Sequence, residues 1–181
     1  MDILAHGLWA GIGVTLIRRR HRVSRRTAAV AIAMAVVPDL VQLIPFLTGA
    51  LFAKDGVSVL HAYVMALPGF EPVLPPIVAL LTHHLHCIMH SAIIAAVVAF
   101  MVAPTTWSSW LPLLGWWSHI VIDVFTHSND FYPVPVLYPF TQNGFDGLAW
   151  NTPWFLVVNY VTIGAGMLYL AGTRRIWGQD R

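Results

Sequence analysis

Charged residues and cysteine are scarce in this sequence of 181 residues. Only 10% of the residues are Asp, Glu, Lys or Arg, whereas 57% are hydrophobic, and the mean hydropathy is +0.69. Soluble globular domains carry about 25% charged residues. The single cysteine, Cys87, excludes an intrachain disulfide framework, and the lack of a CxxC motif argues against a thiolate zinc site. We therefore expect the lipid bilayer to be the solvent of this chain.

Five apolar stretches predict an all-α, polytopic membrane protein with a bundle of about five transmembrane helices. They cover residues 3–17, 27–52, 73–103, 107–125 and 153–171. A helix needs roughly 20 residues to cross the hydrocarbon core, so the first stretch, with 15 residues, is short. No repeat or linker divides the sequence. We expect a single integral-membrane helical domain over residues 1–181.

The basic residues are concentrated at a few points of the chain, and their distribution predicts its orientation. Six arginines lie between Arg18 and Arg26. Loops rich in Lys and Arg stay on the cytoplasmic side, which places the N-terminus outside and the C-terminus, with Arg174, Arg175 and Arg181, in the cytoplasm. We therefore expect a multi-pass protein of the cell inner membrane. The basic cluster could also bind anionic lipids, but we expect no nucleic acid partner, and the sequence leaves the oligomeric state open.

Histidine and aspartate residues recur within the apolar stretches at a spacing of four residues. Residues four apart lie on the same face of a helix, and a charged side chain at the bilayer centre costs about 3 kcal/mol on insertion scales. These residues are therefore expected to face the interior of the bundle. The spaced sets are Asp2 with His6, His86 with His90, and His119 with Asp123 and His127.

Four helices are expected to bring polar side chains to one depth in the membrane. Counted from the cytoplasmic end of its stretch, each of four residues lies 12 or 13 positions along the helix: His6, Asp39, His90 and His119. At about 1.5 Å per residue, this places all four roughly 18 to 20 Å above the inner boundary. The sequence therefore predicts that they meet in the outer half of the bilayer.

Six residues make up the predicted ligand set of a buried metal site. Imidazole and carboxylate ligands suit zinc, manganese or iron(II), with zinc preferred, and a bridging carboxylate allows either one or two ions. A lone histidine on an apolar face is more often a hydrogen-bonded core residue, but several at one depth with aspartates favour a site. The carboxylates argue against haem ligation, and the pattern assigns no role to His83, His84 or Cys87. The predicted ligands are His6, Asp39, His86, His90, His119 and Asp123.

Four short motifs punctuate most of the chain. They are MDILAHGL at the start, VVPDL, HCIMHS, and SHIVIDVFTHSNDFYPVPVLYPF followed by FDGLAW. At these motifs the sequence resembles the bacterial family of membrane-bound metal-dependent hydrolases, although many members have a His–Arg pair before Thr-His-Ser where this chain reads LHCIMHS. That family is distantly similar to zinc-dependent phospholipase C, and His119 and Asp123 resemble its HxxxD element. The resemblance implies hydrolysis of a phosphoester.

A membrane-embedded, metal-dependent hydrolase is the function that we expect from this sequence. The depth of the predicted site favours a phospholipid or another lipid-linked phosphoester that enters from the outer leaflet. His127 and Asp2 are the candidates for proton transfer to the leaving group.

Two other functions stay open at the level of the sequence. A divalent-cation or proton transporter also uses intramembrane His and Asp residues. It predicts a polar path toward the cytoplasm, whereas residues 28–36 and 93–101 are almost purely apolar. A non-catalytic membrane protein with a structural metal needs only a closed site of four ligands. No HExxH motif occurs, which disfavours a metalloprotease.

Overall fold

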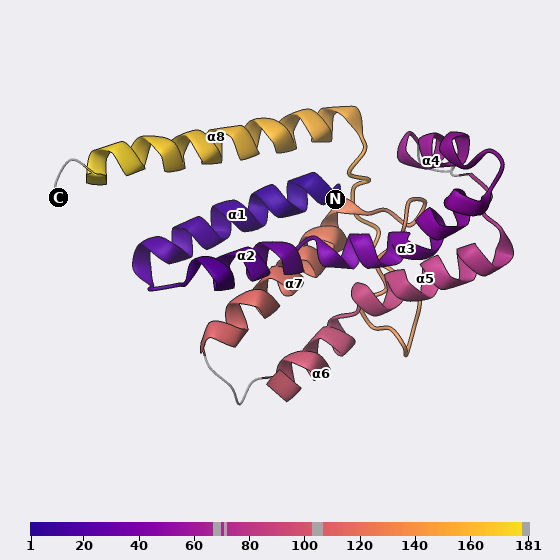
Figure 1. Cartoon of the computed structure of the whole chain (residues 1–181), viewed down its shortest axis with the longest axis horizontal. Coiled ribbons are helices and arrows are strands. Elements are labelled where there is room, and N and C mark those ends of the chain that lie inside the picture. The colour runs from indigo at the N-terminus through magenta and orange to yellow at the C-terminus, as the bar shows by residue number, and fades with distance from the viewer. Residues whose placement is uncertain (67–69, 71, 103–106, 179–181) are drawn as a thin grey trace.

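The computed structural model describes residues 1–66, 70, 72–102 and 107–178 (Figure 1). No strand occurs within these ranges, which confirms the all-α prediction. The helices in the described part of the chain are α1 (Ile3–Arg20), α2 (Arg25–Met34), α3 (Val37–Phe52), α4 (Gly56–Val64), α5 (Pro76–Met89), α6 (Ala92–Val102), α7 (Trp107–Thr126) and α8 (Pro153–Gly178).

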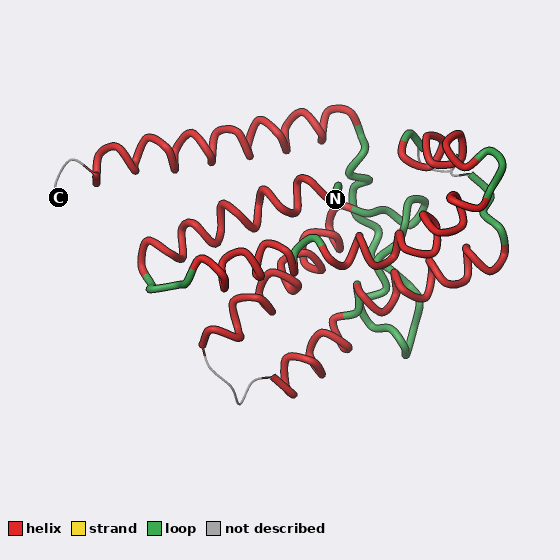
Figure 2. Tube along the Cα trace, viewed as in Figure 1, coloured by secondary structure: helices red, strands yellow, loops and turns green. Residues whose placement is uncertain are grey.

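The apolar stretch 27–52 is broken into two helices, α2 and α3, which are bent by 53° relative to one another (Figure 2). α2 ends at Met34 and α3 begins at Val37. Pro38 explains the break, because a proline lacks the N–H that would bond to the carbonyl group of residue 34, and its ring clashes with that group. The continuous helix suggested by hydropathy is therefore interrupted just before Asp39.

The stretch 73–103 is likewise divided, into α5 and α6, which meet at an angle of 55°. The break follows His90. Ser91 caps the new helix, because its Oγ accepts from the backbone N–H of Ile94 at 3.2 Å. The same Oγ donates to the carbonyl oxygen of Tyr138 at 2.6 Å. A residue of the long loop before α8 thus helps to hold the turn at which His90 lies.

One helix in the described part of the chain, over Pro153–Thr173 in α8, is long and apolar enough to cross a membrane. The bent pairs α2–α3 and α5–α6 pass the same test if each is counted as one span, so the described residues contain up to three candidate spans. A helical protein with a candidate span agrees with the prediction, whereas the five-span bundle stays a prediction. Arg181, which contributed to the predicted orientation, lies outside the described residues.

The connection over residues 54–72 contains a helix that the sequence interpretation missed. α4 has nine residues, which is too short to give a distinct periodic signal. Residues 67–69 and 71 of this connection lie outside the described part of the chain. The other long connection, residues 127–150, has no helix, and it folds back over the end of α7 with a bond from the N–H of Trp150 to the carbonyl oxygen of Thr126 at 2.9 Å.

Close helix packing positions the face of α7 that carries the polar residues. A Cβ atom at Gly115 would overlap the carbonyl oxygen of Ala31, so only glycine permits this approach of α7 to α2, one turn before His119. α1 and α8 run side by side (Figure 1), and Nε1 of Trp9 donates to Oδ1 of Asn159 at 2.9 Å between them. The start of α1 lies near both the helix break and the end of α7, because Gly7 approaches Val36 and the Met1 ammonium group donates to Asp123.

Candidate metal centre

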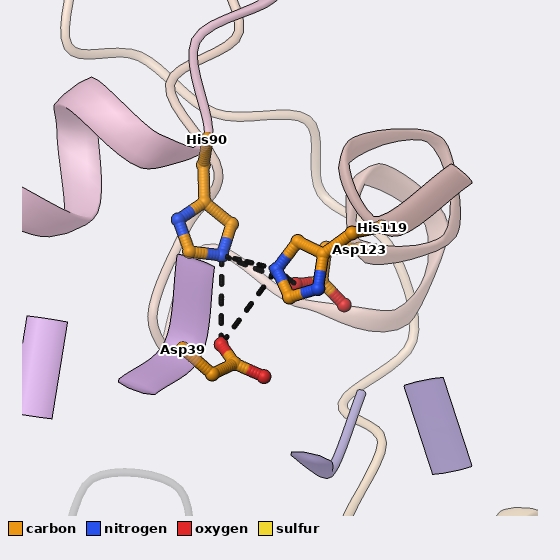
Figure 3. Close-up of side chains that lie close together, drawn as sticks. All are labelled: Asp39, His90, His119 and Asp123. Carbon is orange, nitrogen blue, oxygen red and sulfur yellow. Dashed lines mark hydrogen bonds and ion pairs between the residues drawn. The ribbon is translucent and has the colours of Figure 1, made fainter. Parts of the chain in front are cut away.

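Four buried side chains meet at the helix breaks beside α7 (Figure 3). Asp39 comes from the first turn of α3, His90 from the junction of α5 and α6, and His119 and Asp123 from α7. Each residue offers one ligand atom, and these atoms lie within 4.8 Å of one another. Asp39 is 5% exposed and the other three side chains are 0% exposed. These residues, called the four-residue group below, can hold a metal ion.

The ligand atoms of the four-residue group are close enough to share one cation. Nε2 of His90 lies 3.0 Å from Nε2 of His119. Oδ2 of Asp123 lies 3.2 Å from the nitrogen of His90 and 3.1 Å from that of His119. Oδ1 of Asp39 lies 3.7 Å from both nitrogens. Two imidazoles and two carboxylates therefore point toward one place.

Backbone carbonyl groups fix the position of the hydrogen on both imidazole rings. Nδ1 of His119 lies 2.8 Å from the carbonyl oxygen of Ala35, and Nδ1 of His90 lies 2.9 Å from that of His86. A carbonyl oxygen only accepts, so each Nδ1 carries a hydrogen and donates it. Each Nε2 of a neutral ring then presents a lone pair. Two lone pairs that face each other at 3.0 Å repel unless a metal ion or a shared proton lies between them.

The two carboxylates of the group have unfilled acceptor capacity as well. Oδ2 of Asp39 and Oδ2 of Asp123 are buried and have no hydrogen-bond partner. A buried, charged acceptor without a donor is strongly destabilising. A divalent cation next to Oδ2 of Asp123 and Oδ1 of Asp39, the oxygens that face the two imidazoles, would balance the charge of both carboxylates, so the residues present fit a metal ion.

The break between α2 and α3 frees the carbonyl group that orients His119. Ala35 is the C-cap residue of α2. In a continuous helix its carbonyl oxygen would accept the N–H of residue 39, but the turn before Pro38 releases it. The same turn therefore brings Asp39 to the site and holds the His119 ring in the ligand orientation.

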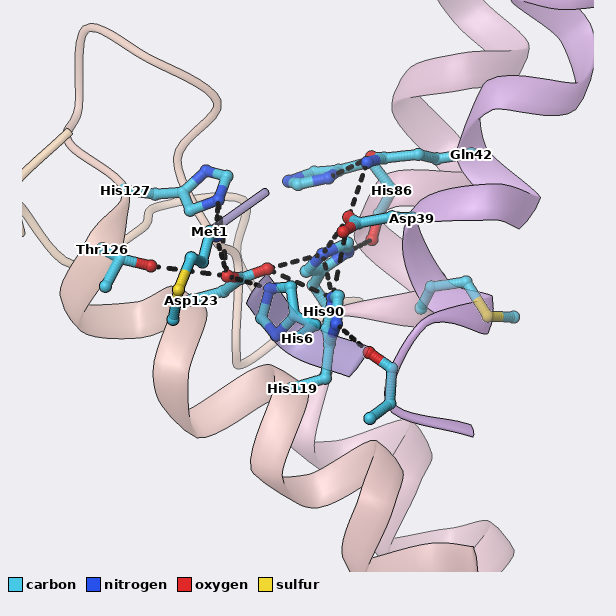
Figure 4. A network of polar contacts seen from close by, with 12 residues as sticks. Met1, His6, Asp39, Gln42, His86, His90, His119, Asp123, Thr126 and His127 are labelled. Atoms are coloured by element: carbon cyan, nitrogen blue, oxygen red, sulfur yellow. Dashed lines mark hydrogen bonds and ion pairs between the residues drawn. The ribbon is translucent and has the colours of Figure 1, made fainter. Parts of the chain in front are cut away.

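Asp123 connects the four-residue group to a second set of polar groups on its other side (Figure 4). Its Oδ1 lies 2.8 Å from Nε2 of His6 and 3.5 Å from Nε2 of His127, and it accepts a hydrogen bond from the Met1 ammonium group. The His6 ring also stacks on the His119 ring, with centroids 3.9 Å apart. The structure thus places His6 beside the four-residue group and joins the two through Asp123.

His127 directly follows the last residue of α7 and faces Asp123. Its Nδ1 lies 2.7 Å from the carbonyl oxygen of Tyr132, so this nitrogen carries the hydrogen. Its Nε2 lies 2.9 Å from the nitrogen of Met1, which donates to it. Burial, together with the nearby ammonium group, lowers the pKa of His127 below its ordinary value. The ring is therefore neutral near pH 7, with Nε2 able to accept a proton.

His86 reaches the four-residue group through Gln42. Nδ1 of His86 lies 2.6 Å from Oε1 of Gln42, whose Nε2 donates to Oδ1 of Asp39 at 3.0 Å. Nε2 of His86 lies 3.1 Å from the carbonyl oxygen of Pro133. Both ring nitrogens are engaged by oxygen atoms, and the structure does not bring His86 into the group. Gln42 was missed by the sequence interpretation, although it lies three positions after Asp39 on one face of α3.

Gln42→Leu is expected to weaken metal binding without removing a ligand. The variant takes away the N–H that orients Asp39, and loss of such an outer hydrogen bond lowers metal affinity by about 10- to 100-fold. Competition with a zinc indicator on detergent-purified protein measures the dissociation constant. Gln142→Leu, at an exposed position, is the matched control and should bind as the wild type does. Equal affinities of Gln42→Leu and wild type would contradict this role.

Asp2 has a contact that the sequence interpretation did not anticipate. It is the N-cap residue of α1, where its Oδ1 accepts from the backbone N–H of Ala5 at 2.9 Å. The same oxygen accepts from the hydroxyl group of Tyr160 at 2.8 Å. Its Oδ2 is buried without a hydrogen-bond partner. One oxygen of Asp2 therefore stabilises the start of α1, and the other is available to a ligand.

The remaining polar residues of α5 lie outside the four-residue group. His83 is exposed, and its Nε2 lies 3.1 Å from Oε1 of Gln142 and 3.6 Å from Sγ of Cys87. Nδ1 of His84 lies 3.4 Å from the hydroxyl group of Tyr138. The contacts with Gln142 and Tyr138 tie α5 to the loop before α8.

The fold and the site together define a helical protein with a candidate membrane span and a buried centre that can hold a metal ion. The chain matches no family model, no curated protein and no solved structure. Its function therefore has to be inferred from the chemistry of its own residues.

Proposed function

We propose that this chain is a metal-dependent hydrolase of the bacterial inner membrane that acts on a phospholipid or another lipid-linked phosphoester. The observation that carries the proposal is the convergence of four acceptor atoms beside a cavity. This cavity has a volume of about 550 Å³, and Asp39 and His127 are among the residues that line it. A structural metal needs only a closed site, whereas this group reaches a space that can accept a substrate through Asp39, which lines the cavity.

The four-residue group would hold the catalytic ion. Two imidazole and two carboxylate ligands favour zinc, and manganese or iron(II) is also compatible with them. When bound, a divalent ion activates water and polarises a phosphoryl oxygen. A second ion on the Oδ1 side of Asp123, beside Nε2 of His6, would have to replace the Met1 ammonium group that donates to Asp123 in this structure.

His127 is the residue that we assign to proton transfer. Its ring is held by the carbonyl group of Tyr132, it lines the cavity, and its Nε2 faces Asp123. A neutral imidazole in this position can take up a proton and deliver it to the leaving-group oxygen. Asp2, the other candidate, is the weaker one because one of its oxygens already caps α1.

A lipid substrate is supported by the wall of the cavity and by the surroundings of the site. Leu43, Phe46 and Leu47 of α3 line the cavity together with Leu60 of α4 and Leu156 of α8. α8 is the helix that is long and apolar enough to cross a membrane. With the N-terminus outside, the cavity would receive its substrate from the outer leaflet. The motifs that resemble membrane-bound metal-dependent hydrolases agree with this assignment.

Metal content and lipid turnover, measured on the same detergent-purified protein, test the proposal. Elemental mass spectrometry is expected to find one or two zinc ions per chain. Vesicles of phosphatidylethanolamine and phosphatidylglycerol are expected to release cleaved lipid products in zinc but not in EDTA. Zinc uptake into sealed vesicles without cleavage would indicate a transporter, and bound zinc with neither activity would indicate a structural metal. Either result would overturn the proposal.

A further inference from the structure

The cavity beside the four-residue group combines a few polar groups with a largely apolar wall. Asp2, Asp39 and Asn151 contribute polar side chains, and leucine and phenylalanine side chains of α3, α4 and α8 form much of the remainder. No Lys or Arg is among the described residues that line it. The cavity therefore suits a molecule that has both a polar head and an apolar chain.

The polar atoms that these three residues leave free are hydrogen-bond acceptors. Oδ2 of Asp2, Oδ2 of Asp39 and Oδ1 of Asn151 are buried and have no hydrogen-bond partner. In Asp2 and Asn151, the other polar atom of the side chain already has a hydrogen-bond partner. Oδ1 of Asp2 accepts from the hydroxyl group of Tyr160 at 2.8 Å, and Nδ2 of Asn151 donates to the carbonyl oxygen of Ala66 at 3.2 Å. The orientation that leaves the acceptors free is thus built into the fold.

The burial of these acceptors makes a missing donor costly. Asp39 is only 5% exposed, and a buried carboxylate oxygen without a donor is strongly destabilising. The ammonium group of Met1 also lies at the cavity, but it donates to Asp123 and lies 2.9 Å from Nε2 of His127. The described residues therefore provide no hydrogen-bond donor for the free acceptors of Asp2 and Asn151.

A primary ammonium group matches this set of acceptors. It carries three N–H donors and a positive charge, whereas Asp2 and Asp39 carry negative charges. A trimethylammonium group has the charge but no N–H, a glycerol head group has donors but no charge, and an anionic head group would be repelled. Tyr63, Tyr132 and Trp150 also line the cavity, and aromatic rings attract a cation that lies over their faces.

We propose that Asp2 and Asn151, with Asp39 beside the metal centre, form a subsite for the primary ammonium group of a zwitterionic lipid of the ethanolamine type. The inference rests on the proposed function, because the phosphoester next to that ammonium group is the bond presented to the four-residue group. The acyl chains lie against the apolar wall formed by α3, α4 and α8.

The preference of the enzyme for one phospholipid head group over the others, measured on the whole chain, tests this subsite. Three phospholipids with the same acyl chains but ethanolamine, choline or glycerol head groups are compared by kcat/KM in zinc-containing detergent micelles. The ethanolamine lipid is expected to be preferred by about tenfold, the effect of one charge-assisted hydrogen bond. Asp2→Asn keeps a helix cap and should remove most of this preference, measured as the ratio of kcat/KM for the ethanolamine lipid to kcat/KM for the glycerol lipid. Asn151→Leu should reduce the preference as well, and Asp55→Asn, at an exposed position away from the cavity, should leave it unchanged.

Binding without turnover separates this inference from the proposed function. Native mass spectrometry of EDTA-treated protein is expected to show retention of short-chain ethanolamine lipid over the choline and glycerol lipids, and loss of this selectivity in Asp2→Asn. Equal retention and equal turnover of the three lipids would overturn the ammonium subsite alone. Selective retention with no turnover of any lipid would support the subsite and overturn the hydrolase.

Discussion

Replacement of Asp123 by asparagine is expected to abolish both zinc binding and the turnover of lipid phosphoesters. One oxygen of this fully buried carboxylate faces His90 and His119, and the other faces His6 and His127. Asparagine keeps the shape but removes the charge and places an N–H₂ group among acceptors. Zinc affinity should fall by more than about 100-fold, because even the loss of an outer hydrogen bond lowers metal affinity by 10- to 100-fold.

Elemental mass spectrometry and lipid turnover on the same preparation measure this effect. Asp130→Asn is the matched control, because it makes the same chemical change at an exposed position in the loop that follows α7. Its zinc content and kcat/KM should equal those of the wild type. Circular dichroism should show that both variants retain the helical fold. A folded Asp123→Asn protein with full zinc content and full activity would remove this residue from the site.

Helical spacing and depth made the centre of the site predictable from the sequence. His119 and Asp123 are four residues apart, and Asp39 and His90 lie a similar number of residues from the ends of their stretches. In a membrane protein such residues are expected to face one another rather than lipid. The four residues do meet in the structure, which confirms that a buried group able to hold a metal ion is present.

The contacts that orient these ligands could not be predicted in the same way. The carbonyl group of Ala35 becomes available only because the helix breaks before Pro38, and hydropathy averages over such a break. The turn at His90 depends on a bond from Ser91 to Tyr138, 47 residues further along the chain. Local sequence patterns contain no information about that pairing. The helix breaks also explain why the number of membrane spans cannot be read from the apolar stretches alone.

Zinc is expected to stabilise the wild-type protein strongly against unfolding. Without a cation, the Nε2 atoms of His90 and His119 face each other at 3.0 Å, and two buried carboxylate oxygens lack donors. A ligand at about 1,000 times its dissociation constant stabilises the folded state by about 4 kcal/mol, which corresponds to a rise of roughly 8 to 16 °C in Tm for a chain of this size. EDTA should reverse this rise, and thermal unfolding in detergent measures it.

His119→Ala distinguishes a metal centre from a network of shared protons. The variant removes one ligand, so its Tm should no longer respond to zinc. It also removes one of the two opposed lone pairs, so the free energy of unfolding without zinc should fall by less than the deletion of a buried ring normally costs. His61→Ala, at an exposed position on α4, should keep the full response. If zinc left the Tm of the wild type unchanged, a proton would have to lie between His90 and His119 instead. The four acceptors would then form a structural hydrogen-bond network, and the hydrolase proposal would lose its chemical basis.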